Sequence, residues 1–185
     1  MALAPRKKLW STPVEVQDAA LGLLQVTEQD VVVDIGAGDG RFLMHAATKT
    51  SARRVFGVEI DEERGSAAQA AIAELCLAEG RVQLIIGNAL EQDYSEGTAF
   101  FLYLVPRGLR IVLPLLKALG RPLRVVTYMA PFPESERPLR VVKVSTEQHP
   151  EAQWPLYYYE IGPGAEGAVA EAGAGAAEEG AGAEE

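Results

Sequence analysis

The chain has 185 residues, of which 48% are hydrophobic, with one cysteine and two histidines. This length can bury the core of one domain, and no apolar run approaches the roughly 18 residues that a membrane-spanning helix needs. One cysteine excludes an internal disulfide, and Cys76, His45 and His149 are too few for a zinc cluster.

The formal charge of −9 is concentrated at one end of the chain. Residues 164–185 contain six Glu and no basic residue, so six of the nine excess negative charges lie there and the rest of the chain carries −3. That remainder has no broad basic stripe, which disfavours a large nucleic-acid surface. Because residues 164–185 are almost entirely Gly, Ala and Glu, they cannot bury a core, and we expect a disordered acidic tail.

Residues 1–10 are expected to form a flexible N-terminal arm. Arg6, Lys7 and Lys8 make this arm basic, but the apolar segment of a secretory signal does not follow them. We therefore expect a cytoplasmic protein, with a mitochondrial location as the alternative. The folded domain should span residues 11–163, and the sequence leaves its oligomeric state open.

The first predicted element is a helix over residues 13–26. Thr12 is placed to cap this helix, Pro13 suits its first turn, and Glu15 is placed to complete a capping box. Apolar residues then recur at helical spacing on one face: Val16, Ala19, Ala20, Leu23 and Leu24. We expect this face to pack beside a sheet.

Residues 31–61 follow the order strand, glycine-rich turn, helix, strand, acid. The apolar run 31–35 reads as a buried parallel strand and leads directly into the turn 36–40. A helical pattern follows, and a second strand ends at Glu59. This order predicts a nucleotide-binding βαβ unit. Free backbone amides at the helix start would suit an anionic group, and Glu59 could accept two hydrogen bonds from ribose hydroxyls.

The glycine spacing selects the class of nucleotide. Dinucleotide-binding folds use G-x-G-x-x-G to seat a pyrophosphate, whereas Gly36, Gly38 and Gly40 give G-x-G-x-G after Asp34. A nicotinamide-dependent oxidoreductase is therefore disfavoured. A glycine-rich turn that binds nothing is the alternative, but the strand before it, the helix after it and the acid one strand later favour a nucleotide site.

The rest of the chain continues the alternation of helices and strands. We expect a helix over 62–79, with Cys76 as a buried structural thiol, and a helix from Pro106. Because no helical pattern separates the last two strands, they should form an antiparallel pair. The predicted fold is α/β, a Rossmann-like three-layer sandwich with a seven-stranded, mostly parallel sheet whose last strand is antiparallel. The five further strands are predicted over 81–86, 98–105, 123–128, 138–145 and 154–161.

Asn88 and Ala89 follow the third predicted strand. In a parallel sheet the tip of this strand lies beside the tips of the first two. The side-chain amide of Asn88 and the backbone amide of Ala89 could therefore pair with the edge of a base. A turn asparagine without such a role is the alternative.

Six segments of the chain resemble one enzyme family. The glycine turn is similar to motif I of the class I S-adenosylmethionine (SAM) methyltransferases. The first and fifth segments resemble a branch of small protein-lysine methyltransferases found in prokaryotes and mitochondria. In chain order the six segments are STPVEV (11–16), VVVDIGAGDGRF (31–42), GVEID (57–61), GNALEQD (87–93), TAFFLYLVP (98–106) and RVVTYMAP (124–131).

The resemblance implies SAM as the cofactor and a set of residues that bind it. The three glycines would seat its methionine part, and Asp34 would orient the turn and the amino group. Glu59 would hold the ribose, Ile60 would pack on the adenine, and Thr12 would close over the cofactor. No metal is expected. The complete cofactor set is Thr12, Asp34, Gly36, Gly38, Gly40, Glu59, Ile60, Asn88 and Ala89.

The expected methyl acceptor is a lysine side chain of a protein substrate. No D-P-P-Y or N-P-P-Y, the motifs that hold a target base or amide, follows the fourth predicted strand, which disfavours methylation of bases or glutamine. Tyr103, at the end of that strand, is the candidate for lining the acceptor channel, with an ordinary sheet aromatic as the alternative. A small-molecule methyltransferase, an RNA methyltransferase and a non-catalytic subunit of the same fold remain the competing functions.

Overall fold

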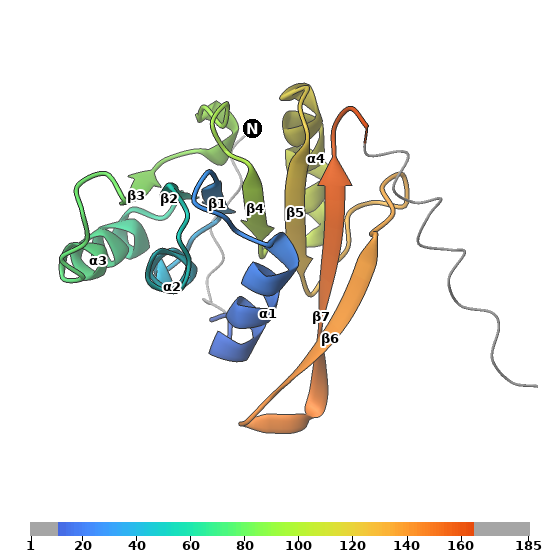
Figure 1. Cartoon of the computed structure of the whole chain (residues 1–185), viewed down its shortest axis with the longest axis horizontal. Coiled ribbons are helices and arrows are strands. Elements are labelled where there is room, and N and C mark those ends of the chain that lie inside the picture. The colour runs from blue at the N-terminus through green and yellow to red at the C-terminus, as the bar shows by residue number, and fades with distance from the viewer. Residues whose placement is uncertain (1–10, 165–185) are drawn as a thin grey trace, which may run out of the picture.

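The structure is a computed structural model that describes residues 11–164 (Figure 1). These residues form one seven-stranded sheet in the order β3-β2-β1-β4-β5-β7-β6. The helices are α1 (Val14–Leu24), α2 (Arg41–Lys49), α3 (Glu62–Ala73) and α4 (Pro106–Ala118), with a short 3₁₀ turn η1 (Ala89–Glu91). The strands are β1 (Val31–Ile35), β2 (Arg54–Glu59), β3 (Val82–Ile86), β4 (Ala99–Leu102), β5 (Leu123–Tyr128), β6 (Arg140–Thr146) and β7 (His149–Ile161).

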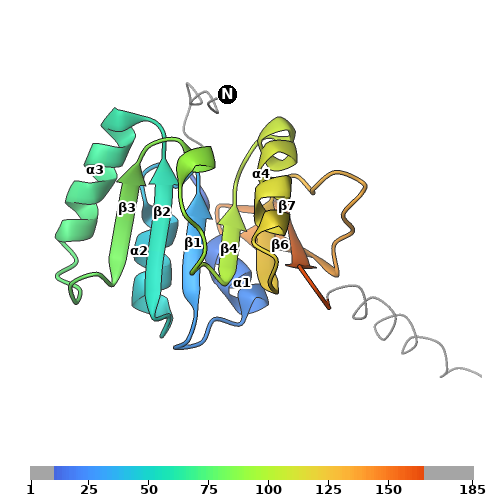
Figure 2. The ribbon, with the colours of Figure 1, turned by 90° about the horizontal axis from the view of Figure 1, so that it is seen from above.

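The strand directions confirm the predicted fold class. The strands from β3 to β5 run parallel to one another, and β7 runs antiparallel to both β5 and β6. Helices cover both faces of the sheet, with α1 and α2 on one face and α4 on the other (Figure 2). Since successive strand residues point to opposite faces, Val32 and Val33 belong to different cores.

The strand order reverses direction between β1 and β4. From β1 the chain adds β2 and β3 on one side, and it then returns to place β4 on the other side. Ligands of open parallel sheets bind outside the carboxyl ends of the strands at such a point. The loop 36–40 after β1 and residues 103–105 after β4 meet there, because a Cβ on Gly36 would lie 2.9 Å from Leu104 Cδ2.

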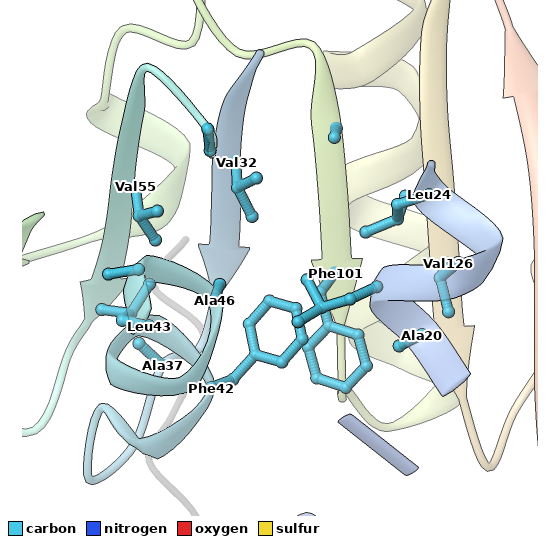
Figure 3. Close-up of a cluster of buried hydrophobic side chains, with 14 of the residues drawn as sticks. Ala20, Leu24, Val32, Ala37, Phe42, Leu43, Ala46, Val55, Phe101 and Val126 are labelled. Atoms are coloured by element: carbon cyan, nitrogen blue, oxygen red, sulfur yellow. The ribbon is translucent and has the colours of Figure 1, made fainter. Parts of the chain in front are cut away.

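A tightly packed core supports the loop after β1. Phe42, on the first turn of α2, stacks on Phe101 of β4 with ring centroids 4.1 Å apart and planes inclined by 17° (Figure 3). Gly57 of β2 lets α2 come close, since a Cβ there would lie 2.8 Å from Leu43 Cδ1. Both contacts fix α2, and with it the end of the loop.

The predicted first helix is present as α1, but the predicted capping box is wrong. Pro13 occupies the N-cap position and no side chain caps the helix. The Oε1 atom of Glu15 instead accepts a hydrogen bond from the backbone N of Glu147, 3.0 Å away in the turn between β6 and β7. A tertiary contact has replaced the local contact that the sequence suggested.

The predicted helix over 62–79 ends at Ala73, and the prediction for Cys76 is wrong. Leu75 and Cys76 donate backbone hydrogen bonds three residues back, and Cys76 takes a φ of 49°. Its thiol is exposed. Beyond Ala68 this helix has no fully buried side chain, so little packing energy is available to extend it.

The fourth strand is shorter than predicted. β4 pairs with β1 and β5 only as far as Leu102, and Val105 is extended before Pro106 opens α4. Tyr103 therefore follows the strand instead of ending it. The antiparallel pairing of the last two strands is confirmed, although β7 begins at His149, five residues earlier than predicted.

Within residues 11–164, no helix is long and apolar enough to cross a bilayer. The same residues contain no group of three or more His, Cys, Asp or Glu that could hold a metal ion. The predictions for the arm 1–10 and, apart from Gly164, for the tail 164–185 lie outside the described residues.

Candidate active site

The loop after β1 is held by backbone hydrogen bonds to the end of β2. The N–H groups of Gly36 and Ala37 both donate to the carbonyl of Val58, at 2.9 and 3.0 Å, and Gly40 N donates to Ala37 O at 2.9 Å. The glycines Gly36, Gly38 and Gly40 all have positive φ, between 58° and 87°, where glycine alone is unstrained. These three loop amides therefore have acceptors. At the start of α2, where the sequence predicts free amides, Arg41 N donates to Asp39 Oδ1 at 3.3 Å.

Glu59 links the loop to the end of β2. Its side chain is buried, and each carboxylate oxygen accepts one backbone N–H: Oε2 from Gly38 at 2.8 Å and Oε1 from Asp61 at 2.9 Å. A carboxylate oxygen can accept a second hydrogen bond. The two backbone hydrogen bonds therefore fix the orientation of the Glu59 carboxylate, while each of its oxygens can accept one more hydrogen bond. This arrangement suits a carboxylate that accepts hydrogen bonds from the two hydroxyls of a ribose.

Asp34 is a buried carboxyl group without a hydrogen-bond partner. It is only 3% exposed, and no hydrogen bond joins its side chain to another residue within 11–164. Burial, with the nearby charges of Glu59 and Asp39, raises the pKa of Asp34 well above its usual value. A cationic group would both satisfy this carboxyl and restore its charge. The amino group of a bound SAM is such a cation, so the residues present fit the expected cofactor.

The residues at the end of β3 are less open to a ligand. Asn88 caps the η1 turn, because its Oδ1 accepts from Leu90 N at 3.1 Å and its Nδ2 donates to Glu91 Oε1 at 2.8 Å. Ala89 is buried, and its carbonyl accepts from the hydroxyl of Tyr94. The Asn88 side chain thus has the structural role of a turn asparagine, while Ile60 is half-buried at the end of β2.

Thr12 is buried beside the start of α1, at one end of a cleft of about 700 Å³. The cleft lies between α1, the outer side of α2 and the turn joining β6 to β7, and Thr12 is the only predicted cofactor residue among its lining residues. Among residues 11–164 the Thr12 hydroxyl has no hydrogen-bond partner. Its backbone carbonyl accepts from Gln17 Nε2 at 2.8 Å.

Aromatic and apolar residues follow β4 and β5. The ring of Tyr103 lies 4.5 Å from that of Tyr128, inclined by 55°. Burial, with Tyr103 nearby, raises the pKa of Tyr128 above its usual value, so this phenol stays protonated at neutral pH. Val105 lies two residues after Tyr103, and Met129 directly follows Tyr128. Their side chains are 47% and 41% exposed, which leaves an apolar rim at the two strand ends.

The sequence analysis assigns no role to three of the residues described above, although the segment RVVTYMAP (124–131) contains two of them. Gln17 stands between Val16 and Asp18 in a helical pattern, Tyr128 reads as an ordinary strand residue, and Met129 has a φ of 68° that only the structure reveals. A non-glycine residue in this region is uncommon. The resemblance of the segment 124–131 and the short interval between the fifth strand and the following prolines could have drawn attention to Met129.

Comparisons with known proteins agree on the chemistry of this site. A family model described as "Putative methyltransferase" matches residues 28–97. A protein-lysine N-methyltransferase of Saccharolobus islandicus is 33% identical over 129 residues, which cover 69% of this chain and 80% of that protein. A ribosomal RNA small subunit methyltransferase A of Pelotomaculum thermopropionicum is 34% identical over 97 residues, covering 51% of this chain but 31% of that protein.

Among solved structures, an RNA methyltransferase of Salinibacter ruber in complex with S-adenosyl-L-homocysteine (SAH) superposes with a TM-score of 0.72. The two chains are 32% identical, and the match covers 83% of this chain and 95% of the other. Together with the seven-stranded sheet in the order described, these matches show that the protein belongs to the class I SAM-dependent methyltransferases and uses S-adenosylmethionine as its cofactor.

Proposed function

We propose that the protein transfers a methyl group from SAM to the side chain of a lysine in a protein substrate. The observation that carries this proposal is the apolar rim after β4 and β5. Val105 and Met129 are exposed there beside Tyr103, and the segment 103–106 contains no carboxylate, amide or cation that could hold a polar base. The four methylenes of a lysine stem match such a surface better than a polar ring does.

Methyl transfer from SAM to lysine requires that the acceptor nitrogen is aligned with the methyl group and that the amine is neutral. SAM supplies an activated methyl group, so the protein must orient the acceptor and exclude water. A free lysine has a pKa of about 10.4 and is charged at neutral pH. An apolar channel disfavours the charged form and lowers that pKa. Tyr103 is the residue that we place in this channel.

The site geometry supports our assignment of the cofactor residues. We assign the ribose to Glu59 and the amino group to Asp34. The Glu59 carboxylate is oriented with acceptor capacity left, and the Asp34 carboxyl has no hydrogen-bond partner within residues 11–164. Gly36, Gly38 and Gly40 would carry the methionine part, and Ile60 the adenine. We assign no contact with the adenine to the side chain of Asn88, because this side chain already caps η1.

RNA methylation is the second candidate function. The Salinibacter and Pelotomaculum relatives are RNA methyltransferases, whereas the Saccharolobus relative acts on protein lysine. Charge favours the protein substrate, because residues 1–163 carry a formal charge of only −3 and RNA binding draws on clusters of Lys and Arg.

The test is to identify the methylated atom. The full-length protein is incubated with labelled SAM and either a protein extract or total RNA, and products are analysed by mass spectrometry. Methyl groups on lysine Nε support the proposal, and label confined to RNA or to small metabolites rejects it. Tyr103→Ala should then slow methyl transfer while SAH affinity stays within about twofold, and Val141→Ala on the exposed strand β6 is the control.

A further inference from the structure

The cleft of about 700 Å³ between α1, α2 and the β6–β7 turn lies at the same edge of the sheet as the glycine loop. β7 pairs with β5 only from Leu156 onward, opposite Tyr128, so the β6–β7 turn extends past the carboxyl end of β5. Arg41, which lines the cleft, directly follows Gly40 at the end of the loop. Among the described residues that line the cleft none belongs to this loop, so the cleft is a separate site beside it.

The basic side chains of the cleft are already paired with acids. Three of them line it, and each has an acidic partner outside the lining: Arg41 with Asp39, His45 with Asp18, and His149 with Glu151. The Arg41 guanidinium donates to Asp39 Oδ2 from both Nε and Nη2, at 2.9 and 2.6 Å. These pairs leave little positive charge for an anionic ligand.

The carboxylates of the cleft, in contrast, have no cationic partner. Glu15 and Glu147 both line it, and within residues 11–164 neither forms an ion pair with Lys, Arg or His. Glu15 Oε1 accepts a hydrogen bond from Glu147 N at 3.0 Å, which lowers the pKa of Glu15 and keeps it charged at neutral pH. The cleft therefore has two negative charges that the described residues do not balance.

Gln17 adds a buried hydrogen-bond acceptor to the lining of the cleft. Its side chain is only 5% exposed, and its Nε2 donates to the carbonyl of Thr12 at 2.8 Å. Its Oε1 accepts no hydrogen bond from any residue within 11–164. Buried acceptors are normally paired, so a ligand that donates N–H groups would complete this lining.

Apolar side chains cover another part of the cleft. Val14 is 52% exposed there, and Met44 and Leu75 line the cleft with it. A Lys or Arg side chain combines an alkyl stem, which packs on such a surface, with a cationic head that donates hydrogen bonds. A phosphate backbone would instead bring negative charge next to Glu15 and Glu147, so the cleft fits a basic protein segment better than RNA.

We propose that the cleft binds a lysine- or arginine-containing segment of the protein substrate, apart from the lysine that is methylated. This inference rests on the protein substrate of the proposed function. A segment bound there lies at the edge of the sheet that also holds the glycine loop and the apolar rim of Val105 and Met129. The cleft would thus add affinity and specificity without taking part in methyl transfer.

The test is the binding of a short fluorescein-labelled peptide of alternating lysine and alanine, measured by fluorescence anisotropy without SAM. Glu15→Gln and Glu147→Gln each remove one negative charge, and the amide introduced by Glu15→Gln can still accept from Glu147 N. We expect the peptide Kd to rise about fourfold in each variant and about tenfold in the double variant, the range of partly exposed ion pairs. The Tm should stay unchanged.

Glu28→Gln is the matched control, because it makes the same change of charge at an exposed position just before β1. Its peptide Kd should stay within about twofold of wild type. The same peptide with acetylated lysines has lost its positive charges and should bind at least about tenfold more weakly. In the double variant the KM for a protein substrate should rise, while kcat and the SAH Kd stay near the wild-type values.

The outcomes separate the cleft from the proposed function. Absence of peptide binding by the wild-type protein overturns the proposal, and so does an unchanged Kd in the double variant or equal weakening by Glu28→Gln. Equal binding of the acetylated peptide, or competition by a short oligoribonucleotide, also overturns it. If the peptide binds as expected but the wild-type protein methylates no lysine, the proposed function fails and the binding site for a basic peptide stands.

Discussion

Two buried aspartates lie near the two ends of strand β1, and their carboxyl groups have opposite surroundings. Asp30, just before the strand, is 5% exposed, and Asp34, near its carboxyl end, is 3% exposed. Asp30 accepts hydrogen bonds from Thr27 N at 2.7 Å and from Thr98 Oγ1 at 2.7 Å, and it forms an ion pair with Arg124. Asp34 accepts none from the residues that the structure describes.

The hydrogen bonds and the ion pair of Asp30 stabilise the fold, whereas we propose that Asp34 binds the cofactor. Burial opposes the ionisation of Asp30, but its hydrogen bonds and Arg124 outweigh that effect and lower its pKa. At Asp34 nothing offsets the effect of burial. The negative charges of Glu59 and Asp39 also oppose ionisation, so the pKa of Asp34 rises. Buried polar groups are normally paired in native proteins, so the unpaired carboxyl is the one that we propose to bind the cofactor.

The largest predicted effect is on stability at the Asp30 end. Asp30→Asn removes the charge opposite Arg124 and points an NH₂ group at donors, and we expect a loss of about 3 kcal/mol. For a chain of this size that corresponds to a fall in Tm of about 6–12 °C. Thermal unfolding followed by circular dichroism measures it.

SAH affinity is the control for this variant. Because Asp30 lies at the opposite end of β1 from the glycine loop, the Kd for SAH should stay within about twofold. Weaker SAH binding with an unchanged Tm would mean that Asp30 serves the site, and the contrast with Asp34 would be lost.

The second prediction concerns Glu59, which is hydrogen-bonded within the fold and which we propose also binds the ribose. Glu59→Ala removes the acceptor for ribose and also releases Gly38 N and Asp61 N. We expect SAH binding to weaken by about 2–4 kcal/mol, with a smaller fall in Tm. Isothermal calorimetry of the variant gives the value.

Glu59→Gln refines this result. The single oxygen of the glutamine amide can still accept a hydrogen bond from one backbone N–H, so the loop conformation should be partly kept. The charge-assisted hydrogen bonds to the ribose should be lost. Unchanged affinity in both variants would remove Glu59 from the cofactor site.

The contrast between short-range and long-range contacts explains what the sequence could predict. The strand 31–35, the turn 36–40 and the acid Glu59 lie within 29 residues, and their order alone predicted the strand, the glycine turn, the helix and the second strand that the structure contains. The pairs that complete the structure join distant segments: Asp30 with Arg124, Glu15 with Glu147, and the rings of Tyr103 and Tyr128. No local pattern reports such contacts.

The predictions of two helix ends were wrong for the same reason, namely contacts between distant segments. Thr12 and Glu15 have the local chemistry of a capping box, but the β6–β7 turn takes Glu15 as its partner. Cys76 has helical spacing relative to Ala68 and Ile72, yet no neighbouring element covers it, and the helix ends before it. Spacing predicts which face is apolar, and only tertiary packing decides whether that face is covered.

The smallest predicted effect has the opposite sign and comes from Asp34. In the unliganded protein, Asp34→Asn should raise stability at neutral pH by about 1–2 kcal/mol, because an amide avoids the cost of a buried charge. It should also weaken SAH binding, since the cationic amino group loses its counter-charge. Thermal unfolding with and without SAH measures both effects.

The pH dependence of the two aspartate variants tests the contrast directly. The folded-state pKa of Asp34 is raised, so its protonated form is favoured by folding and its stabilising contribution is complete below the unfolded pKa of about 3.9. That contribution is lost as the pH rises through the folded pKa. The gain in stability of Asp34→Asn over wild type should therefore grow as the pH rises from about 4 to neutral.

Asp30→Asn should behave in the reverse way. Its folded pKa is lowered, so the wild-type carboxylate stabilises the fold above an unfolded pKa of about 3.9 and loses that effect as the pH falls through the folded value. The loss of stability caused by Asp30→Asn should consequently become smaller as the pH falls. If the Tm differences of both variants changed in the same direction between pH 4 and 7, the two carboxyl groups would not have opposite surroundings. The assignment of Asp34 to the cofactor amino group would then have lost its physical basis.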